Sequence, residues 1–432
     1  MVERKYLDPE IETAPPEINR GRQTEKLKAL VKRVYENTVF YRRRFDEASI
    51  KPEDIQTLED LQRIPPTRYL EDFVGTPVED KLAVPIDKVV LVESTSGTIS
   101  GSPQLIMSSV SDLDAGMHVF TRGLVMCGIG KGDVYQPLIP LSGLELAARE
   151  AGFTVVPFSH AAFSMDNLLG LMVNAKTTVI FTFPSQFLAL VRRASELGID
   201  MKKTGLRTAF FAGESWSGAY RQKMERDWGI SFYDYYGTTE VGEVSVECPE
   251  KTGMHCWPDT VIVEIIDPET EEVLGPGQPG EIVATTLWRE AMPLLRFRTG
   301  DVAEWLEYEP CGCGRTLAKI SRIKGRTEHM IKVGKARIFP SDVEEVVHAT
   351  PGLTGEYQIL VKRPGVQEAL EVTAEYGPES TDLSILTTSL ERTIERSTGA
   401  RVKVNLVPAG AIPAGIQWKA QRIVKAYEEI PG

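Results

Sequence analysis

The chain has 432 residues and an acidic balance, with 61 Asp and Glu against 49 Lys and Arg and a formal net charge of −12. This length exceeds a single compact core and predicts two or three domains. The negative charge argues against a general nucleic-acid binder. A hydrophobic content of 42% with 25% charged residues is typical of a globular protein and excludes fibrous and disordered classes.

No apolar run reaches the roughly 20 residues that a membrane-spanning helix needs. Residues 1–22 are polar and lack the apolar centre of a signal peptide. We therefore expect a cytoplasmic protein that acts on neither membranes nor nucleic acids. The five cysteines are an odd number, which together with a reducing compartment disfavours a disulfide framework.

The predicted elements follow from hydrophobic spacing. Apolar residues at helical spacing predict helices within 22–48. From about 86 to 325, apolar strands alternate with small-residue loops and helices, the strands being 89–95, 177–185, 206–213 and 230–237. This alternation predicts α/β architecture with sites at the carboxyl ends of strands. Further strands at 261–267, 280–287 and 301–310 are predicted to pair as hairpins through Gly and Pro turns.

A domain boundary is predicted near residues 326–329. It gives a large N-terminal domain over 1–327, with mixed sheets, flanking helices and a β-hairpin or barrel-like subdomain. A small α+β domain over 328–432 follows, with strands and two helices.

The sharpest local signal is the loop Ser94–Pro103, which directly follows a β-branched run. Hydroxyls and backbone amides in a glycine-permissive loop suit a phosphate chain. The Gly-Lys-Ser/Thr ending of a Walker loop is missing, so a P-loop is excluded. A Ser/Gly-rich surface turn is the structural alternative.

Four other blocks carry polar side chains. Tyr233–Glu240 follows a strand, and its hydroxyls and carboxylate suit a phosphate with Mg²⁺. Arg296–Asp301 places a carboxylate after an expected tight turn, where it could accept ribose hydroxyls, although Gly-Asp is also common in plain hairpin turns. Gly325–Lys332 is the next block, and Lys419 near the C-terminus is the last; a lone lysine would ordinarily be surface charge.

The order and spacing of these blocks resemble the adenylate-forming superfamily of acyl- and aryl-CoA ligases, adenylation domains and luciferases. Within it, the chain is most similar to the phenylacetate–CoA ligase-like branch, over nearly its whole length. The resemblance implies a large domain with a small mobile C-terminal domain. It also implies an ATP-dependent ligase that makes an acyl-adenylate and pyrophosphate, and then a thioester with coenzyme A.

The resemblance assigns roles by matched position. Lys419 would bridge the carboxylate and the α-phosphate, Glu240 would bind Mg²⁺, and Glu328 would be the hinge of the small domain. The residues assigned to ATP and AMP are Ser94, Thr95, Ser96, Gly97, Thr98, Gly213, Glu214, Asp234, Tyr235, Tyr236, Gly237, Thr238, Asp301 and Arg326.

The segments assigned to the acyl group hold aromatic and small residues: Tyr135, Pro137, Leu138, Phe183, Ala212, Gly213 and Tyr235. They suit a flat aromatic acid such as benzoate, 2-aminobenzoate or an arylacetate; core packing is the structural alternative. The chain departs from the branch at Thr238–Val244, where Leu-Ser-Glu and a Gly-Pro-Gly stretch are usual, and at Trp418, where glycine usually precedes the lysine.

Cys248, His255, Cys311 and Cys313 offer three thiolates and an imidazole, a set typical of closed structural zinc sites. Ordinary buried cysteines are the alternative, and similar Cys and His elements in the phenylacetate–CoA ligase-like branch favour zinc. Cys256 could compete with its neighbour as a ligand.

Two other functions stay open. The chain could pass its acyl group to a carrier protein or an amine, or it could be an inactive nucleotide-binding relative. The presence of Lys419, Glu240 and Asp301 argues against the inactive relative. A homodimer through the N-terminal helices is implied by the family alone.

Overall fold

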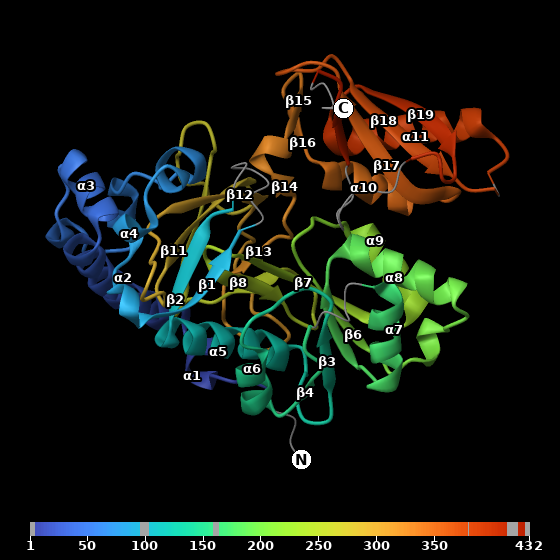
Figure 1. Cartoon of the computed structure of the whole chain (residues 1–432). Coiled ribbons are helices and arrows are strands. Elements are labelled where there is room, and N and C mark those ends of the chain that lie inside the picture. The colour runs from blue at the N-terminus through green and yellow to red at the C-terminus, as the bar shows by residue number, and fades with distance from the viewer. Residues whose placement is uncertain (1–4, 96–102, 159–163, 379, 413–421, 428–432) are drawn as a thin grey trace. The chain divides into compact units, whose positions relative to one another are not determined.

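The computed structural model describes residues 5–95, 103–158, 164–378, 380–412 and 422–427 (Figure 1). Contacts divide the chain into two units, each of which is described here by itself. Unit 1 combines Met1–Phe158 with Tyr233–Arg322, and unit 2 combines Ser159–Phe232 with Ile323–Gly432. The predicted mixed α/β architecture is confirmed. The boundary at 327/328 stays a prediction.

Unit 1 contains the first helices and most of the long strands. Its α-helices are α1 (Pro9–Glu12), α2 (Pro16–Asn37), α3 (Val39–Glu47), α4 (Val78–Lys81), α5 (Val110–Met126) and α6 (Leu144–Ala151). Its strands are β1 (Val89–Ser94), β2 (Leu105–Ser109), β3 (Val134–Pro137), β4 (Thr154–Val155), β7 (Ser231–Thr238, entering from unit 2), β8 (Gly242–Glu247), β9 (Met254–Cys256), β10 (Val261–Ile266), β11 (Gly280–Thr286), β12 (Phe297–Ala303) and β13 (Lys319–Ile320).

The predicted helical stretch at 22–48 is two helices, because the chain turns at Thr38. Its side-chain Oγ1 accepts the backbone N–H of Tyr41 at 3.1 Å and so caps α3. The apolar faces of α2 and α3 form one core cluster with the segment after α3 and with Leu295. This packing explains the helical spacing of the apolar residues.

The strands pair mostly antiparallel. β10, β11 and β12 form one antiparallel ribbon, and β7, β8, β9 and β13 follow each other as antiparallel neighbours. The predicted strand at 301–310 is wrong in its second half. Beyond Ala303 the backbone pairs with the β13 region instead, through Ser321 N–H to Glu304 O at 2.9 Å and Leu306 N–H to Lys319 O at 3.0 Å.

Unit 2 contains helices α7 (Met165–Asn174), α8 (Pro184–Glu196), α9 (Gly218–Trp228), α10 (Pro340–Ala349) and α11 (Leu383–Thr398). Its strands are β5 (Val179–Thr182), β6 (Thr208–Phe211), β14 (Gly325–Arg326), β15 (Ile331–Val333), β16 (Ala336–Ile338), β17 (Leu353–Val361), β18 (Leu370–Tyr376), β19 (Val402–Pro408) and β20 (Ile423–Lys425). β5 and β6 are parallel, as the predicted strand–helix alternation requires.

The last part of unit 2 is a four-stranded sheet in the order β19-β18-β17-β20. Apolar residues of α10, α11 and these strands form one buried cluster, which includes Val343, Ile359 and Leu390. This region is the α+β segment expected near the C-terminus, drawn in orange and red in Figure 1. Across the described residues, none of the helices combines the length and apolar character needed to cross a membrane.

One buried ion pair ties the start of unit 1 to residues more than 300 positions later. Arg315 and Glu12 are 2% and 0% exposed, and Arg315 Nε donates to Glu12 Oε2 at 2.6 Å. The other carboxylate oxygen accepts the backbone N–H groups of Leu7 and Asp8 at 2.7 and 2.8 Å. Both oxygens of the Glu12 carboxylate therefore accept hydrogen bonds, as a buried charge requires.

We predict that Glu12→Ala destabilises the protein by about 3–5 kcal/mol, because it leaves the Arg315 guanidinium buried without its partner. Urea unfolding of the two proteins measures the difference. Glu25→Ala, which removes an exposed partner of Lys28, is the control and should cost less than about 1 kcal/mol. Similar losses for the two variants would contradict this account of the buried pair.

Candidate functional site

The base of the predicted phosphate loop is fixed in unit 1. Ser94 ends β1, and the next residue, Thr95, is buried and bound on both sides to Gln104. Thr95 N–H donates to Gln104 O at 2.9 Å, and Thr95 Oγ1 accepts Gln104 N–H at 3.0 Å. The antiparallel pairing of β1 and β2 thus brings the two ends of the loop together. Ser96, Gly97 and Thr98 lie outside the described residues.

In unit 2, the carboxyl ends of the parallel strands β5 and β6 bring two predicted segments together. Gly213 has φ +71°, and a Cβ there would lie 2.6 Å from Cε1 of Phe183, so only glycine fits. Glu214 accepts the Ser185 hydroxyl at 2.6 Å and the Ser185 backbone N–H at 3.0 Å. Ala212 is half-buried and donates its N–H to Thr182 O at 3.2 Å.

The β7–β8 hairpin of unit 1 carries the next group. A Cβ at Gly237 would lie 2.5 Å from the carbonyl oxygen of Gly242, so the two strands approach each other closely. The Thr238 hydroxyl accepts Val241 N–H at 3.1 Å across the turn. Glu240 lies in this turn and is half-buried.

Tyr236 and Asp301 are buried and meet directly. The Tyr236 hydroxyl donates to Asp301 Oδ2 at 3.0 Å. Asp301 belongs to β12 and not to a tight turn as expected; Gly300, with φ +76°, lies where the pairing of β12 with β11 shifts register. Asp234, also in β7, donates its backbone N–H to Glu247 Oε2 at 3.2 Å.

A buried glutamate beside the predicted acyl segments was not predicted. The Tyr235 hydroxyl donates to Glu243 Oε2 at 2.9 Å, and Trp257 Nε1–H donates to Glu243 Oε1. Burial raises the pKa of Glu243 to about 8, against the opposing effect of these two donors. Every residue of β8 from Glu243 to Glu247 is buried, and no local sequence pattern indicates which side chains contact Glu243.

Tyr135 is fully buried in β3, and its ring packs against Phe120 at 6.1 Å and Phe153 at 5.5 Å. Its hydroxyl has no hydrogen-bond partner within the described part of the chain. Pro137 and Leu138, which end and follow β3, are buried as well. Leu138 is 1% exposed.

Two predicted residues are paired with each other in unit 2. Arg326 ends β14, and its Nε lies 3.3 Å from Glu328 Oε1, the expected hinge residue. Lys419 lies outside the described residues.

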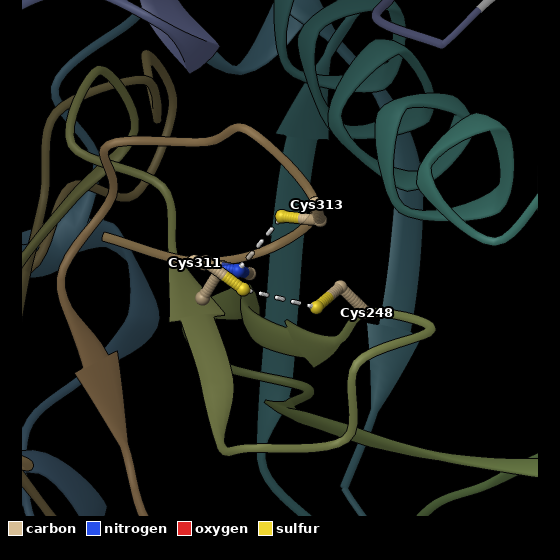
Figure 2. A group of neighbouring side chains, drawn as sticks. Cys248, Cys311 and Cys313 are labelled. Carbon is tan, nitrogen blue, oxygen red and sulfur yellow. Dashed lines mark hydrogen bonds between the residues drawn. The ribbon is translucent and has the colours of Figure 1, made fainter. Parts of the chain in front are cut away.

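The four predicted metal ligands come together in unit 1. Their ligand atoms all lie within 4.8 Å of one another, and all four residues are buried. Figure 2 shows the sulfurs of Cys248, Cys311 and Cys313 gathered between two loops; Cys248 Sγ lies 3.6 Å from Cys311 Sγ, and Cys313 Sγ lies 3.4 Å from His255 Nε2. Zn–S bonds of about 2.3 Å in a tetrahedron put sulfurs about 3.8 Å apart, which this arrangement fits.

The surroundings also suit a metal. His255 Nδ1 lies 3.2 Å from Leu317 O, so a proton on Nδ1 would leave Nε2 free to ligate. The neighbouring Cys248 thiol, and then the His255 ring, hold the pKa of Cys313 well below its ordinary value. Cys256 follows His255 in β9, where consecutive side chains point to opposite faces, so it is not a member of the cluster.

The sequence is similar to known enzymes over nearly its whole length. Residues 18–287 match the AMP-binding enzyme family, and residues 336–426 match the AMP-binding enzyme C-terminal domain. A phenylacetate–coenzyme A ligase of Thermus thermophilus is 34% identical over 96% of this chain and 98% of its own length. The corresponding enzyme of Escherichia coli is 32% identical over 98% of both chains.

Solved structures share the fold. A 2-hydroxyisobutyryl-CoA ligase in the postadenylation state superposes with a TM-score of 0.88, at 24% identity, covering 98% of this chain and 93% of that one. An anthranilate CoA ligase in complex with anthranoyl-AMP gives a TM-score of 0.56 at 17% identity, covering 77% of this chain and 66% of that one. At these identities the likeness is evidence of the fold alone.

Proposed function

We propose that this chain takes an aromatic carboxylate as its acyl substrate. The chain belongs to the AMP-binding enzyme family. It is an AMP-forming acid–CoA ligase of the phenylacetate–CoA ligase-like branch. The observation that carries the proposal is the similarity to phenylacetate–coenzyme A ligases over nearly the whole length of both chains. Benzoate, 2-aminobenzoate and arylacetates are the candidate acids.

The reaction has two steps. A carboxylate oxygen attacks the α-phosphorus of ATP, the bond to the β-phosphate bridging oxygen breaks, and pyrophosphate leaves. The coenzyme A thiolate then attacks the acyl carbon, and the bond to the AMP oxygen breaks. Both steps depend on positioning and charge neutralisation more than on covalent chemistry by the protein.

The ATP-binding roles are assigned by the resemblance to the family. We assign Glu240 to Mg²⁺, which when bound neutralises charge on the phosphates. Asp301, held by Tyr236, is assigned to the ribose hydroxyls. Gly213 and Glu214 are assigned to the adenine side, where the Glu214 carboxylate is kept in place by Ser185.

Support for an aromatic acid comes from residue shape. In unit 2 the Phe183 ring packs directly on Gly213, where a Cβ would lie 2.6 Å from it. In unit 1 the half-buried Tyr235 ring is held by its hydroxyl bond to Glu243. Flat rings pack well against such aromatic walls. Transfer to a carrier protein or an amine is the alternative, and the names of the relatives favour coenzyme A.

We predict that an aromatic acid gives at least tenfold higher kcat/KM than octanoate. The measurement is pyrophosphate release with a panel of carboxylates, followed by detection of the CoA thioester. Comparable efficiency for octanoate and the best aromatic acid would reject the aromatic assignment. Release without thioester formation would favour a carrier protein or amine as acceptor, and no release with any acid would favour an inactive relative.

The second prediction concerns Lys419, assigned by resemblance to the first step. Lys419→Ala should lower acyl-adenylate formation on the order of 10²-fold or more, because its charge stabilises the transition state. Thioester formation from supplied acyl-adenylate should stay within a few-fold if the small domain turns about Glu328 between steps. The two half-reactions are measured separately; equal losses in both would contradict the two-conformation account.

A third part of the proposal is that Cys248, His255, Cys311 and Cys313 hold a structural Zn²⁺. All four ligand positions are filled by protein, as in closed sites that stabilise a fold and do not carry out chemistry. The ion would join the loop after β8 to the loop around Cys311–Gly312–Cys313.

We predict about one zinc per chain in metal analysis of the purified protein, lost in Cys313→Ser. Cys256→Ser, a matched change one residue from His255, should keep the metal. Chelation should lower the melting temperature more than it changes the intrinsic rate constants. A metal-free protein of unchanged stability would refute the site.

A further inference from the structure

Arg289 is a buried cation with unused hydrogen-bond donors. It follows β11, it is 3% exposed, and its Nη2 donates to the carbonyl oxygen of Thr239 at 3.0 Å. Its Nε and Nη1 have no hydrogen-bond partner among the described residues. A buried guanidinium with unpaired donors costs free energy unless an anion completes it, so these nitrogens point to a ligand.

The segment that holds Arg289 is fixed by its neighbours. Trp288 packs so closely on the β7–β8 turn that a Cβ at Gly242 would lie 2.7 Å from its ring. The Asp112 carboxylate accepts the backbone N–H groups of Glu290 and Ala291, the second at 3.0 Å. Arg33 Nη2 donates to the carbonyl oxygen of Arg289. The guanidinium is thus preorganised before any ligand binds.

The charges around Arg289 identify the kind of ligand. The carboxylates of Asp112, Glu93 and Glu240 lie within electrostatic range, but none of them is hydrogen-bonded to the guanidinium. Asp112 is occupied by backbone N–H groups, including that of Ser109 at 2.8 Å. Glu93 precedes Ser94 at the start of the phosphate loop, and Glu240 is assigned to Mg²⁺. A ligand bound at Arg289 would therefore contact a guanidinium that lies near the carboxylates of Glu93 and Glu240, and carboxylates are suitable ligands for a metal ion.

We propose that Arg289 binds the pyrophosphate part of ATP, and pyrophosphate as the product, as an Mg²⁺ complex. The proposal rests on the proposed function for the assignment of Glu240. A guanidinium donates charge-assisted hydrogen bonds to phosphate oxygens, and a bound Mg²⁺ would offset the repulsion between phosphates and carboxylates. Arg289 would therefore stabilise the negative charge that develops on the leaving group.

The test compares Arg289→Met with Arg289→Lys and with Arg33→Met. Isothermal titration with inorganic pyrophosphate and Mg²⁺ needs no acyl substrate, so it separates this proposal from the proposed function. Because a hydrogen bond to a charged group contributes about 1.5–3 kcal/mol, Arg289→Met should weaken binding at least tenfold. Arg289→Lys keeps the charge and should recover part of the loss.

Kinetics provide the second readout. Arg289→Met should raise the KM for ATP and slow adenylation while the KM for the acid stays within twofold. Thioester formation from supplied acyl-adenylate involves no pyrophosphate and should stay near the wild-type rate. Arg33→Met loosens the same segment without removing the guanidinium, so it should weaken pyrophosphate binding much less than Arg289→Met does.

Three results would overturn the proposal: unchanged pyrophosphate affinity in Arg289→Met, an equal loss in Arg33→Met, or equal loss of both half-reactions. Weaker pyrophosphate binding in Arg289→Met, in a protein that activates none of the acids, would uphold the anion site and reject the proposed acyl substrate.

Discussion

The β7–β8 turn depends on two positions that have no side chain. At Gly237 a Cβ would collide with the backbone of Gly242, and at Gly242 it would collide with the Trp288 ring. These two close approaches fix the strands, the turn and the segment after β11 relative to one another. The backbone that carries Glu240 and Arg289 is therefore held in place, as the roles proposed for these two side chains require.

Much of the fold was predictable because the strands are apolar and β-branched. The strands predicted at 89–95, 177–185, 206–213 and 230–237 correspond to β1, β5, β6 and β7. Hydrophobic runs of this kind depend on local composition, which the sequence displays directly. The end of β12 was not predictable, since residues 304–306 pair with a strand that follows the Cys311–Cys313 loop.

The site was predictable where the residue types themselves indicate the chemistry, and not where it depends on which side chains become neighbours in the fold. The predicted Cys and His ligands gather as expected, but only the alternation along β9 separates His255 from Cys256. Glu243 lies in β8, and its bonds to Tyr235 in β7 and to Trp257 after β9 depend on how these strands pack. Contacts of this kind, between residues of different elements, cannot be predicted from the local pattern of a single sequence.

The Glu12–Arg315 pair has a consequence for biosynthesis. The two residues are 303 positions apart, so at about 5–20 residues per second Arg315 is added about 15–60 s after Glu12. Unit 1 is also discontinuous, since Ser159–Phe232 belongs to unit 2. The Glu12 carboxylate of the nascent N-terminal segment therefore lacks its Arg315 partner until nearly three quarters of the chain has been synthesised. Native completion of unit 1 is accordingly a late event in translation, and loop closure over this distance slows the step.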